Sequence, residues 1–173
     1  PKLNGIIHAA GVLDDGLIQN QTWQRFLPLL KSKIIGAWNL HQLSLKHNLE
    51  HFVMFSSVAS VFGTHGQSNY AAANSFLDNL ATFRRKQGLC SLSINWGPWA
   101  NIGMAKDIKP RVDGLAKLSP KVAMELFDVL MKQDSPEQIL VIDIKWNNTF
   151  AQHGMKLVFL ENFWRESKLP QHT

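Results

Sequence analysis

Short apolar runs alternate along this chain with longer stretches in which apolar residues recur at helical spacing. The short runs, which predict strands, are 3–11, 51–55, 90–95 and 139–143. The longer stretches, which predict helices, are 22–30, 31–47, 69–87 and 119–132. Strands that alternate with helices are typical of a parallel sheet with helices on both faces. We therefore expect an α/β fold built on a Rossmann-like, doubly wound parallel sheet.

The predicted sheet is thin for its class. A parallel sheet needs both faces and both edges covered, and a buried first strand this near position 1 would more naturally lie inside a larger sheet. A dinucleotide-binding fold also needs a glycine-rich turn at its first helix to hold a pyrophosphate. No two glycines stand two positions apart, so G-x-G-x-x-G has no match. We expect an incomplete fold that lacks the N-terminal glycine-rich βαβ portion and is inactive without it.

The same pattern divides the chain into two regions. Residues 1–145 carry every predicted strand and helix, and a segment rich in glycine, lysine and proline follows residue 97 and runs to 118. From residue 146 onward the pattern weakens, which predicts a linker or tail over 146–173. Aromatic residues of the first two predicted helices are expected in the core: Trp23, Phe26 and Trp38.

Composition and charge limit the possible partners. The 173 residues are 45% hydrophobic and 18% charged, as in soluble globular proteins. The formal charge of +5 is mild and scattered, and no recognition motif accompanies it. We therefore expect an anionic cofactor or an acidic protein partner rather than nucleic acid.

Cysteine, histidine and the apolar runs exclude further classes. Cys90 is the only cysteine, so no internal disulfide is possible. His41, His47 and His51 have no cysteine or acidic partner at ligand spacing, so we expect no metal site. No apolar run has the length of a membrane span, and no secretory signal precedes the first predicted strand. These observations together predict a cytoplasmic protein with no membrane segment.

A serine and a tyrosine carry the candidate chemistry. Ser57 follows a predicted strand, and Tyr70, the only tyrosine, stands thirteen residues later at the start of a predicted helix. Asn74 follows one turn after Tyr70, on the same helix face. Two hydroxyl donors at such a place suit polarisation and protonation of a carbonyl oxygen. The alternative is an ordinary strand-end serine and an ordinary aromatic residue at a helix start.

Four strings, in this order and spacing, resemble the ketoreductase domain of modular polyketide synthases. They are GIIHAAGVLDD, KSKIIGAWNLH, FVMFSSVASVFGTHGQSNYAAANSFLDNLATFRRKQG and SINWGPWANIGMA. That domain is a branch of the short-chain dehydrogenase/reductase family, and the resemblance covers about residues 3–145.

The resemblance implies a catalytic tetrad. Tyr70 corresponds to the tyrosine that donates a proton to the carbonyl oxygen, and Ser57 to the serine that hydrogen-bonds that oxygen. Lys33 corresponds to the lysine that lowers the pKa of the tyrosine, and Asn74 to the asparagine of the same site. Ordinary short-chain reductases have lysine four residues after the tyrosine. Asparagine at that position, with lysine on the preceding helix, is typical of the synthase branch.

The resemblance also implies where cofactor and substrate bind. The residues expected beside an NADPH cofactor are Ala9, Ala10, Gly11, Gly97 and Pro98. The residues expected to control product stereochemistry are Leu13, Asp14, Asp15, Phe62 and Met104. The LDD triplet is similar to that of B-type enzymes, which form the D-configured hydroxyl, although acidic residues there could also serve a turn. Met104 falls in a string similar to the start of the lid over the substrate groove, which places the lid at about 97–118.

The function implied is reduction of a β-ketoacyl thioester to a β-hydroxyacyl thioester. The expected partners are an acyl carrier protein, which holds the acyl chain on phosphopantetheine, and neighbouring synthase domains. One alternative is a non-catalytic structural fragment of a megasynthase, which the missing glycine turn favours and the tetrad disfavours. The other is a stand-alone short-chain reductase of free ketones, which the exchange of asparagine and lysine disfavours.

Overall fold

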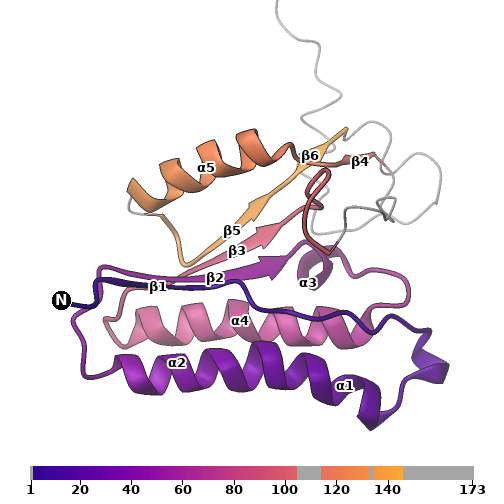
Figure 1. Cartoon of the computed structure of the whole chain (residues 1–173), viewed down its shortest axis with the longest axis horizontal. Helices are drawn as coiled ribbons and strands as arrows, with labels where there is room; N and C mark the ends of the chain where they lie inside the picture. The colour runs from indigo at the N-terminus through magenta and orange to yellow at the C-terminus, as the bar shows by residue number, and fades with distance from the viewer. Residues whose placement is uncertain (1, 105–113, 133–134, 146–173) are drawn as a thin grey trace, which may run out of the picture.

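A four-stranded parallel sheet forms the centre of the protein in the computed structural model, which describes residues 2–104, 114–132 and 135–145 (Figure 1). Its strands lie in chain order: β1 (Gly5–His8), β2 (His51–Ser57), β3 (Leu92–Trp96) and β5 (Gln138–Val141). Each strand pairs in parallel with its neighbour. The predicted α/β class with a parallel sheet is confirmed.

Helices cover both faces of this sheet, as parallel strands require. One face carries α1 (Trp23–Leu29), α2 (Gly36–Ser44) and α4 (Ser68–Lys86), and the other carries α5 (Pro120–Lys132) (Figure 1). Shorter helical segments are η1 (Ile18–Asn20), η2 (Leu30–Ile35) and α3 (Ala59–Phe62). No helix in the described ranges is long and apolar enough to cross a membrane.

The core has two layers because successive side chains of a strand point to opposite faces. Phe52 and Met54 of β2 pack with Ala37 and with Leu77 beneath the sheet. Val53, between them, packs in the second cluster, on the side of α5. All five residues of β3 are buried because this strand has a neighbour on each side and a helix on each face.

The first strand was predicted to be buried inside a larger sheet, but it is mostly exposed in the part of the chain that the structure describes. β1 lies at the edge of the described sheet and pairs only with β2. Ile7 is 54% exposed, and His8 is the only buried residue of the strand. The side chains of a strand are buried only where other elements cover both faces of the sheet. In the described ranges no element covers the face of β1 that carries Ile7.

The predicted burial of two tryptophans is wrong. Trp23 is 62% exposed and Trp38 is 40% exposed, whereas Ala37 and His41 of α2 are buried. Trp38 instead packs at the surface on the rings of His41 and Phe83, at centroid distances of 5.0 and 6.2 Å. Adjacent positions of a helix differ in direction by about 100°, so Ala37 faces the core while Trp38 lies toward its edge.

The last predicted strand divides into two. β5 ends at Val141, and β6 (Asp143–Ile144) pairs antiparallel with β4 (Leu115–Ala116) in a separate small sheet. Residues 105–113 of the predicted lid and the predicted tail at 146–173 lie outside the described residues. The domain boundary at residue 145 stays a prediction.

Candidate active site

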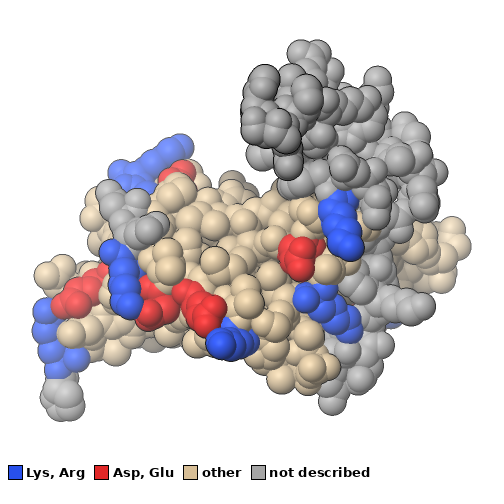
Figure 2. Space-filling view, turned by 90° about the horizontal axis from the view of Figure 1, so that it is seen from above, with Lys and Arg blue, Asp and Glu red and all other residues tan. Residues whose placement is uncertain are grey.

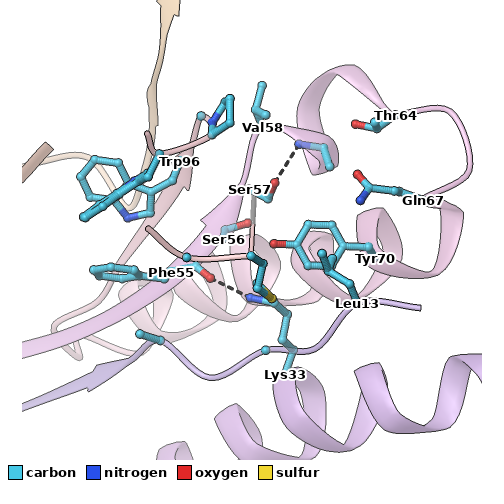
Figure 3. A pocket seen from close by; sticks show the side chains of 18 of the residues that line it. Leu13, Lys33, Phe55, Ser56, Ser57, Val58, Thr64, Gln67, Tyr70 and Trp96 are labelled. Carbon is cyan, nitrogen blue, oxygen red and sulfur yellow. Dashed lines mark hydrogen bonds between the residues drawn. The ribbon is translucent and has the colours of Figure 1, made fainter. Parts of the chain in front are cut away.

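A cavity of about 420 Å³ opens at the carboxyl ends of β1, β2 and β3 (Figure 3). Ligands of open α/β sheets bind outside these strand ends. Its walls come from the segment after β1, from η2, from the β2–α4 region and from the turn after β3. The polar or charged side chains among its lining residues are Lys33, Ser56, Ser57, Thr64, Gln67 and Tyr70.

Aromatic rings form one wall of this cavity. The ring centroids of Phe55 and Trp96 lie 5.6 Å apart, and those of Trp96 and Trp99 lie 5.1 Å apart. Phe55 also packs at 5.7 Å on Phe127 of α5, which ties the wall to the core. An apolar wall of this kind lowers the local dielectric and strengthens the electrostatic interactions of the polar side chains opposite.

Ser57 and Tyr70 meet in the cavity although thirteen residues separate them. Ser57 is the last residue of β2, and Tyr70 lies in the first turn of α4. The backbone N–H of Ala59 donates to Ser57 Oγ at 3.2 Å, and both Ser57 and Tyr70 line the cavity. Figure 3 shows the phenol oxygen directed toward the end of β2. The two hydroxyls can therefore act on one oxygen atom.

Burial sets the acidity of Tyr70. Removal of the phenol from water raises the pKa of Tyr70, and the nearby polar side chains of Ser57 and Asn74 partly offset this effect. The resemblance implied that Lys33 lowers the pKa of Tyr70, but Lys33 is not among the groups that shift this pKa. The phenol therefore keeps its proton throughout the neutral pH range, as a proton donor must.

Lys33 lies beneath Tyr70 and is 3% exposed. Its ammonium donates to the carbonyl oxygen of Phe55 at 2.8 Å and lies 5.7 Å from the centroid of the Tyr70 ring. Burial lowers the pKa of Lys33 to about 8, against an opposing effect of the negative charge of Asp78. Lys33 is thus mainly a cation at pH 7 and becomes neutral as the pH rises above 8.

A π-helical segment delivers Lys33 to the cavity. The sequence predicted one helix over 31–47, but η2 has π-helical hydrogen bonding and joins α1 to α2. A π segment inserts an extra residue into the helix, changes the directions of its side chains and occurs often at functional sites. Pro28, which has no N–H to donate, precedes it inside α1 and is the one local signal in the sequence.

His8 lies against the same segment from β1. It is 6% exposed, and its Nε2 is buried with no hydrogen-bond partner among the described residues. A Cβ atom at Gly36, the residue after η2, would lie 3.4 Å from His8 Cε1. Burial first, and then the charge of Lys33, lowers the pKa of His8, so its ring is neutral near pH 7. No spacing in the sequence indicated this contact, because the two residues lie on different elements.

Asn74 is fully buried behind Tyr70 rather than on the cavity surface. Its side-chain amide donates to the carbonyl oxygen of Tyr70 at 2.8 Å, one helical turn back. Its Oδ1 is buried and has no hydrogen-bond partner in the described structure. The amide is thus placed to hold the first turn of α4 in position.

The residues predicted beside a cofactor lie mostly at the cavity. Ala9, Gly11, Gly97 and Pro98 line it, and Ala10 does not. A Cβ atom at Gly11 would lie 3.2 Å from Lys33 Cε and 3.3 Å from Met104 Cε. A Cβ atom at Gly97 would lie 3.3 Å from the Val141 carbonyl oxygen. Close packing with the chain's own atoms therefore accounts for both glycines, whatever binds nearby.

The LDD triplet is fixed by contacts that the sequence did not reveal. Leu13 lines the cavity, and Asp14 forms an ion pair with Arg25 of α1 at 2.5 Å. Asp15 accepts from the side-chain amide of Gln67, with both carboxylate oxygens at 3.0 Å. Residues distant in the chain make these contacts, so spacing alone could not predict them.

The remaining two predicted residues occupy different surroundings. Met104 lines the cavity, as expected of a residue near a substrate groove. Phe62 ends α3 and is not among the lining residues.

The fold and the cavity define a dinucleotide-type α/β domain with a hydroxyl pair and a buried cation at its strand ends. A family model described as "KR domain" matches residues 1–101, more than half of the chain. The chain belongs to the KR domain family, the ketoreductases of modular polyketide synthases. Members of this family are oxidoreductases of the short-chain dehydrogenase/reductase superfamily that bind a nicotinamide cofactor.

Curated relatives are large synthases. Over 143 residues the chain is 44% identical to the phenolphthiocerol synthesis polyketide synthase type I Pks15/1 of Mycobacterium bovis, covering 79% of this chain and 7% of that protein. Over 142 residues it is 44% identical to polyketide synthase GfsB of Streptomyces halstedii, covering 78% of this chain and 2% of that protein. The chain therefore spans only a small part of the length of these relatives.

Solved structures agree with this assignment. The first ketoreductase of the tylosin polyketide synthase is 34% identical, with a TM-score of 0.84, and the match covers 96% of this chain and 38% of that one. An A-type ketoreductase from a modular polyketide synthase is 36% identical, with a TM-score of 0.80 and coverage of 85% and 32%.

Proposed function

We propose that this chain carries the catalytic part of a polyketide synthase ketoreductase, which reduces a β-ketoacyl thioester to a β-hydroxyacyl thioester. The observation that supports this proposal most is the meeting of the Ser57 and Tyr70 hydroxyls in one cavity. The Lys33 ammonium, held beneath the tyrosine ring, is the second support. A ketone oxygen placed against both hydroxyls would receive two donors as negative charge develops on it.

The cavity fits the reactive end of a nicotinamide cofactor. The strand-end residues Ala9, Gly11, Gly97 and Pro98 would hold its ring, with the aromatic wall opposite. The sequence has no glycine-rich turn to hold the pyrophosphate, so these residues account for one end of the cofactor only. When bound, NADPH supplies the hydride.

The chain's own residues would then donate one proton and stabilise one negative charge. Tyr70 donates its phenolic proton to the carbonyl oxygen, and Ser57 donates a hydrogen bond to the same oxygen. The cation of Lys33 stabilises the phenolate that remains on Tyr70. Asn74 keeps the first turn of α4 in place through its bond to the Tyr70 carbonyl.

The substrate would arrive as an acyl chain on the phosphopantetheine of an acyl carrier protein. A basic surface suits such an acidic partner, but on the face seen in Figure 2 lysine, arginine and acidic side chains are interspersed. We therefore place no carrier site on that face. We assign B-type, D-configured product stereochemistry to the LDD triplet, whose Leu13 lines the cavity.

The test is reduction of a β-ketoacyl thioester by the full-length protein with NADPH. Loss of NADPH, appearance of the β-hydroxyacyl thioester by mass spectrometry and its configuration by chiral chromatography are measured together. We expect the D-configured product, and faster reduction of the thioester than of a free ketone of the same length.

Three results would contradict parts of this proposal. A folded protein that forms no β-hydroxyacyl product would support the structural fragment instead. Equal or faster reduction of the free ketone would support a stand-alone reductase. An L-configured product would overturn the stereochemical assignment alone.

A further inference from the structure

A third polar residue follows Tyr70 and Asn74 on the same face of α4. Asp78 comes one turn after Asn74, so the three side chains share one helix face. Asp78 is 7% exposed and does not line the cavity. Burial of a carboxylate is costly unless hydrogen bonds or charges compensate it. Its surroundings therefore need an explanation.

Three neutral side chains surround the carboxylate of Asp78. The hydroxyl of Ser93 lies 2.6 Å from Oδ1, and that of Ser60 lies 2.7 Å from Oδ2. The side-chain amide of Asn95 contacts Oδ1 at 3.0 Å and Oδ2 at 2.9 Å. These partners come from α3 and β3, so one carboxylate joins both elements to α4. Hydrogen bonds to an ionised acceptor are stronger than those between neutral groups.

The same partners hold the backbone of Ser57. Ser60 Oγ lies 2.8 Å from the Ser57 carbonyl oxygen, and its single proton goes either to this carbonyl or to Asp78. The Asn95 amide nitrogen, which carries two protons, lies 3.4 Å from the same carbonyl oxygen. The Asn95 amide nitrogen also lies 3.0 Å from Ser56 Oγ, the hydroxyl next in the chain. The carboxylate thus orders the groups that fix the end of β2, where Ser57 presents its hydroxyl.

Charge links Asp78 to Lys33 as well. The negative charge of Asp78 opposes the effect of burial on Lys33 and raises its pKa. The other titratable groups around Lys33 are His8 on β1, whose pKa the lysine lowers, and Tyr70 on α4. The negative charge of Asp15 raises the pKa of Tyr70. Of the groups that act on Lys33 itself, Asp78 is the one that favours its charged form.

We propose that Asp78 is the positioning residue of this site: through its contacts with Asn95 and Ser60 it fixes Ser57 against Tyr70. This inference rests on the proposed reductase function. Asp78 acts through other residues and does not touch the substrate. A carboxylate that only stabilised the fold would affect unfolding but would leave the pH dependence of turnover unchanged.

The decisive variant is Asp78→Asn in the full-length protein, because it keeps the shape of the side chain and removes the charge. We expect the fall in kcat at high pH to begin at lower pH than in the unmodified protein. We also expect kcat at its optimum to fall about tenfold or more, with little change in KM, because reacting groups are misplaced.

Two matched controls separate charge from packing. Ser93→Ala removes one hydrogen bond to Asp78 and keeps the charge, so it should lower Tm and leave the pH profile in place. Asp128→Asn removes an exposed carboxylate that pairs with the exposed Lys132. It should change neither Tm nor the pH profile.

A second readout requires no reductase activity. The pKa of Lys33, followed by the ¹³C chemical shift of labelled lysine and assigned with Lys33→Met, should be lower in Asp78→Asn. An inactive unmodified protein would then count against the proposed function alone. A folded Asp78→Asn protein with unchanged kcat, pH profile and Lys33 pKa would overturn the inference.

If Asp78→Asn does not fold, Asn95→Ala decides the question. This variant removes the amide that joins Asp78 to the Ser57 carbonyl and keeps the charge of Asp78. A fall in kcat of about tenfold at an unchanged pH profile supports the inference. An unchanged kcat, or a variant that again does not fold, overturns it.

Discussion

Lys33 is the residue whose environment affects the proposed chemistry most. Its ammonium donates to the backbone carbonyl oxygen of Phe55. The side chain is almost completely buried, and the ammonium lies near the ring of Tyr70. Burial disfavours the cation, and the nearby charge of Asp78 favours it. The balance leaves Lys33 charged under neutral conditions but close to titration.

This balance predicts the pH dependence of both activity and stability. Because burial lowers the pKa of Lys33 to about 8, kcat should fall as the pH rises through that value. The folded protein then binds fewer protons than the unfolded chain from about pH 8 to pH 10.5, so the contribution of Lys33 to stability increases across that window. Turnover and urea denaturation, measured from pH 6 to pH 10, test both directions.

The matched variant for this prediction is Lys33→Met, which keeps the length of the side chain and removes its charge. Its kcat should be lower by at least about tenfold and should no longer decrease above pH 8, because the group with a pKa of about 8 has been removed. An unchanged high-pH fall in Lys33→Met would assign the titration to another residue.

At the scale of elements, the helix that carries Tyr70 depends on its ending. α4 ends at Lys86, and Gly88 follows with φ of 73°. The N–H of Leu89 donates to the Arg84 carbonyl and that of Gly88 to the Arg85 carbonyl, both at 3.0 Å. This pattern is a Schellman motif, in which glycine adopts the left-handed conformation without strain.

Two glycine-to-alanine changes should therefore act in opposite directions. Gly88→Ala should lower the free energy of unfolding by about 1 kcal/mol, because a Cβ atom strains the left-handed conformation. Gly36→Ala should leave it unchanged or raise it by up to about 1 kcal/mol, because alanine favours a helix. A Cβ atom at Gly36 would meet nothing closer than 3.4 Å. Urea denaturation of both variants tests this, and a loss for both would contradict it.

The predictions at element scale succeeded where one local pattern determines the structure. The helices of 69–87 and 119–132 were predicted to within a few residues, because a glycine ends one and a proline begins the other. The π-helical segment around Lys33 was not, since apolar spacing does not distinguish it from an α-helix. The exposure of β1 and of Trp23 was also missed, because it depends on which elements lie beside them.

At the scale of the whole molecule, the sheet brings together residues from positions 9 to 115 at one set of strand ends. Sequence spacing and the resemblance predicted Tyr70, Ser57 and Lys33, and the structure places all three at one cavity. Their catalytic roles stay proposals. Asp78, Arg25 and Gln67 were missed, although the regular spacing of Tyr70, Asn74 and Asp78 was visible in the sequence.

The missing glycine-rich turn predicts weak cofactor binding by the 173-residue chain itself. Without a pyrophosphate site, NADPH should bind with a Kd above about 1 mM, since the ring end alone makes few contacts. Fluorescence titration of NADPH against this chain and against a ketoreductase domain that carries a glycine-rich turn measures the difference. Equal affinities for the two would contradict the prediction.

The measurement that tests the account most directly is turnover of a β-ketoacyl thioester by the full-length protein and by its Tyr70→Phe variant. The variant removes one oxygen atom, which carries the donated proton, and leaves the ring in place. The account predicts a loss of about 100-fold or more in kcat at an unchanged Tm. Turnover equal to that of the unmodified protein would contradict the assignment of Tyr70 as the proton donor, and with it the proposed mechanism.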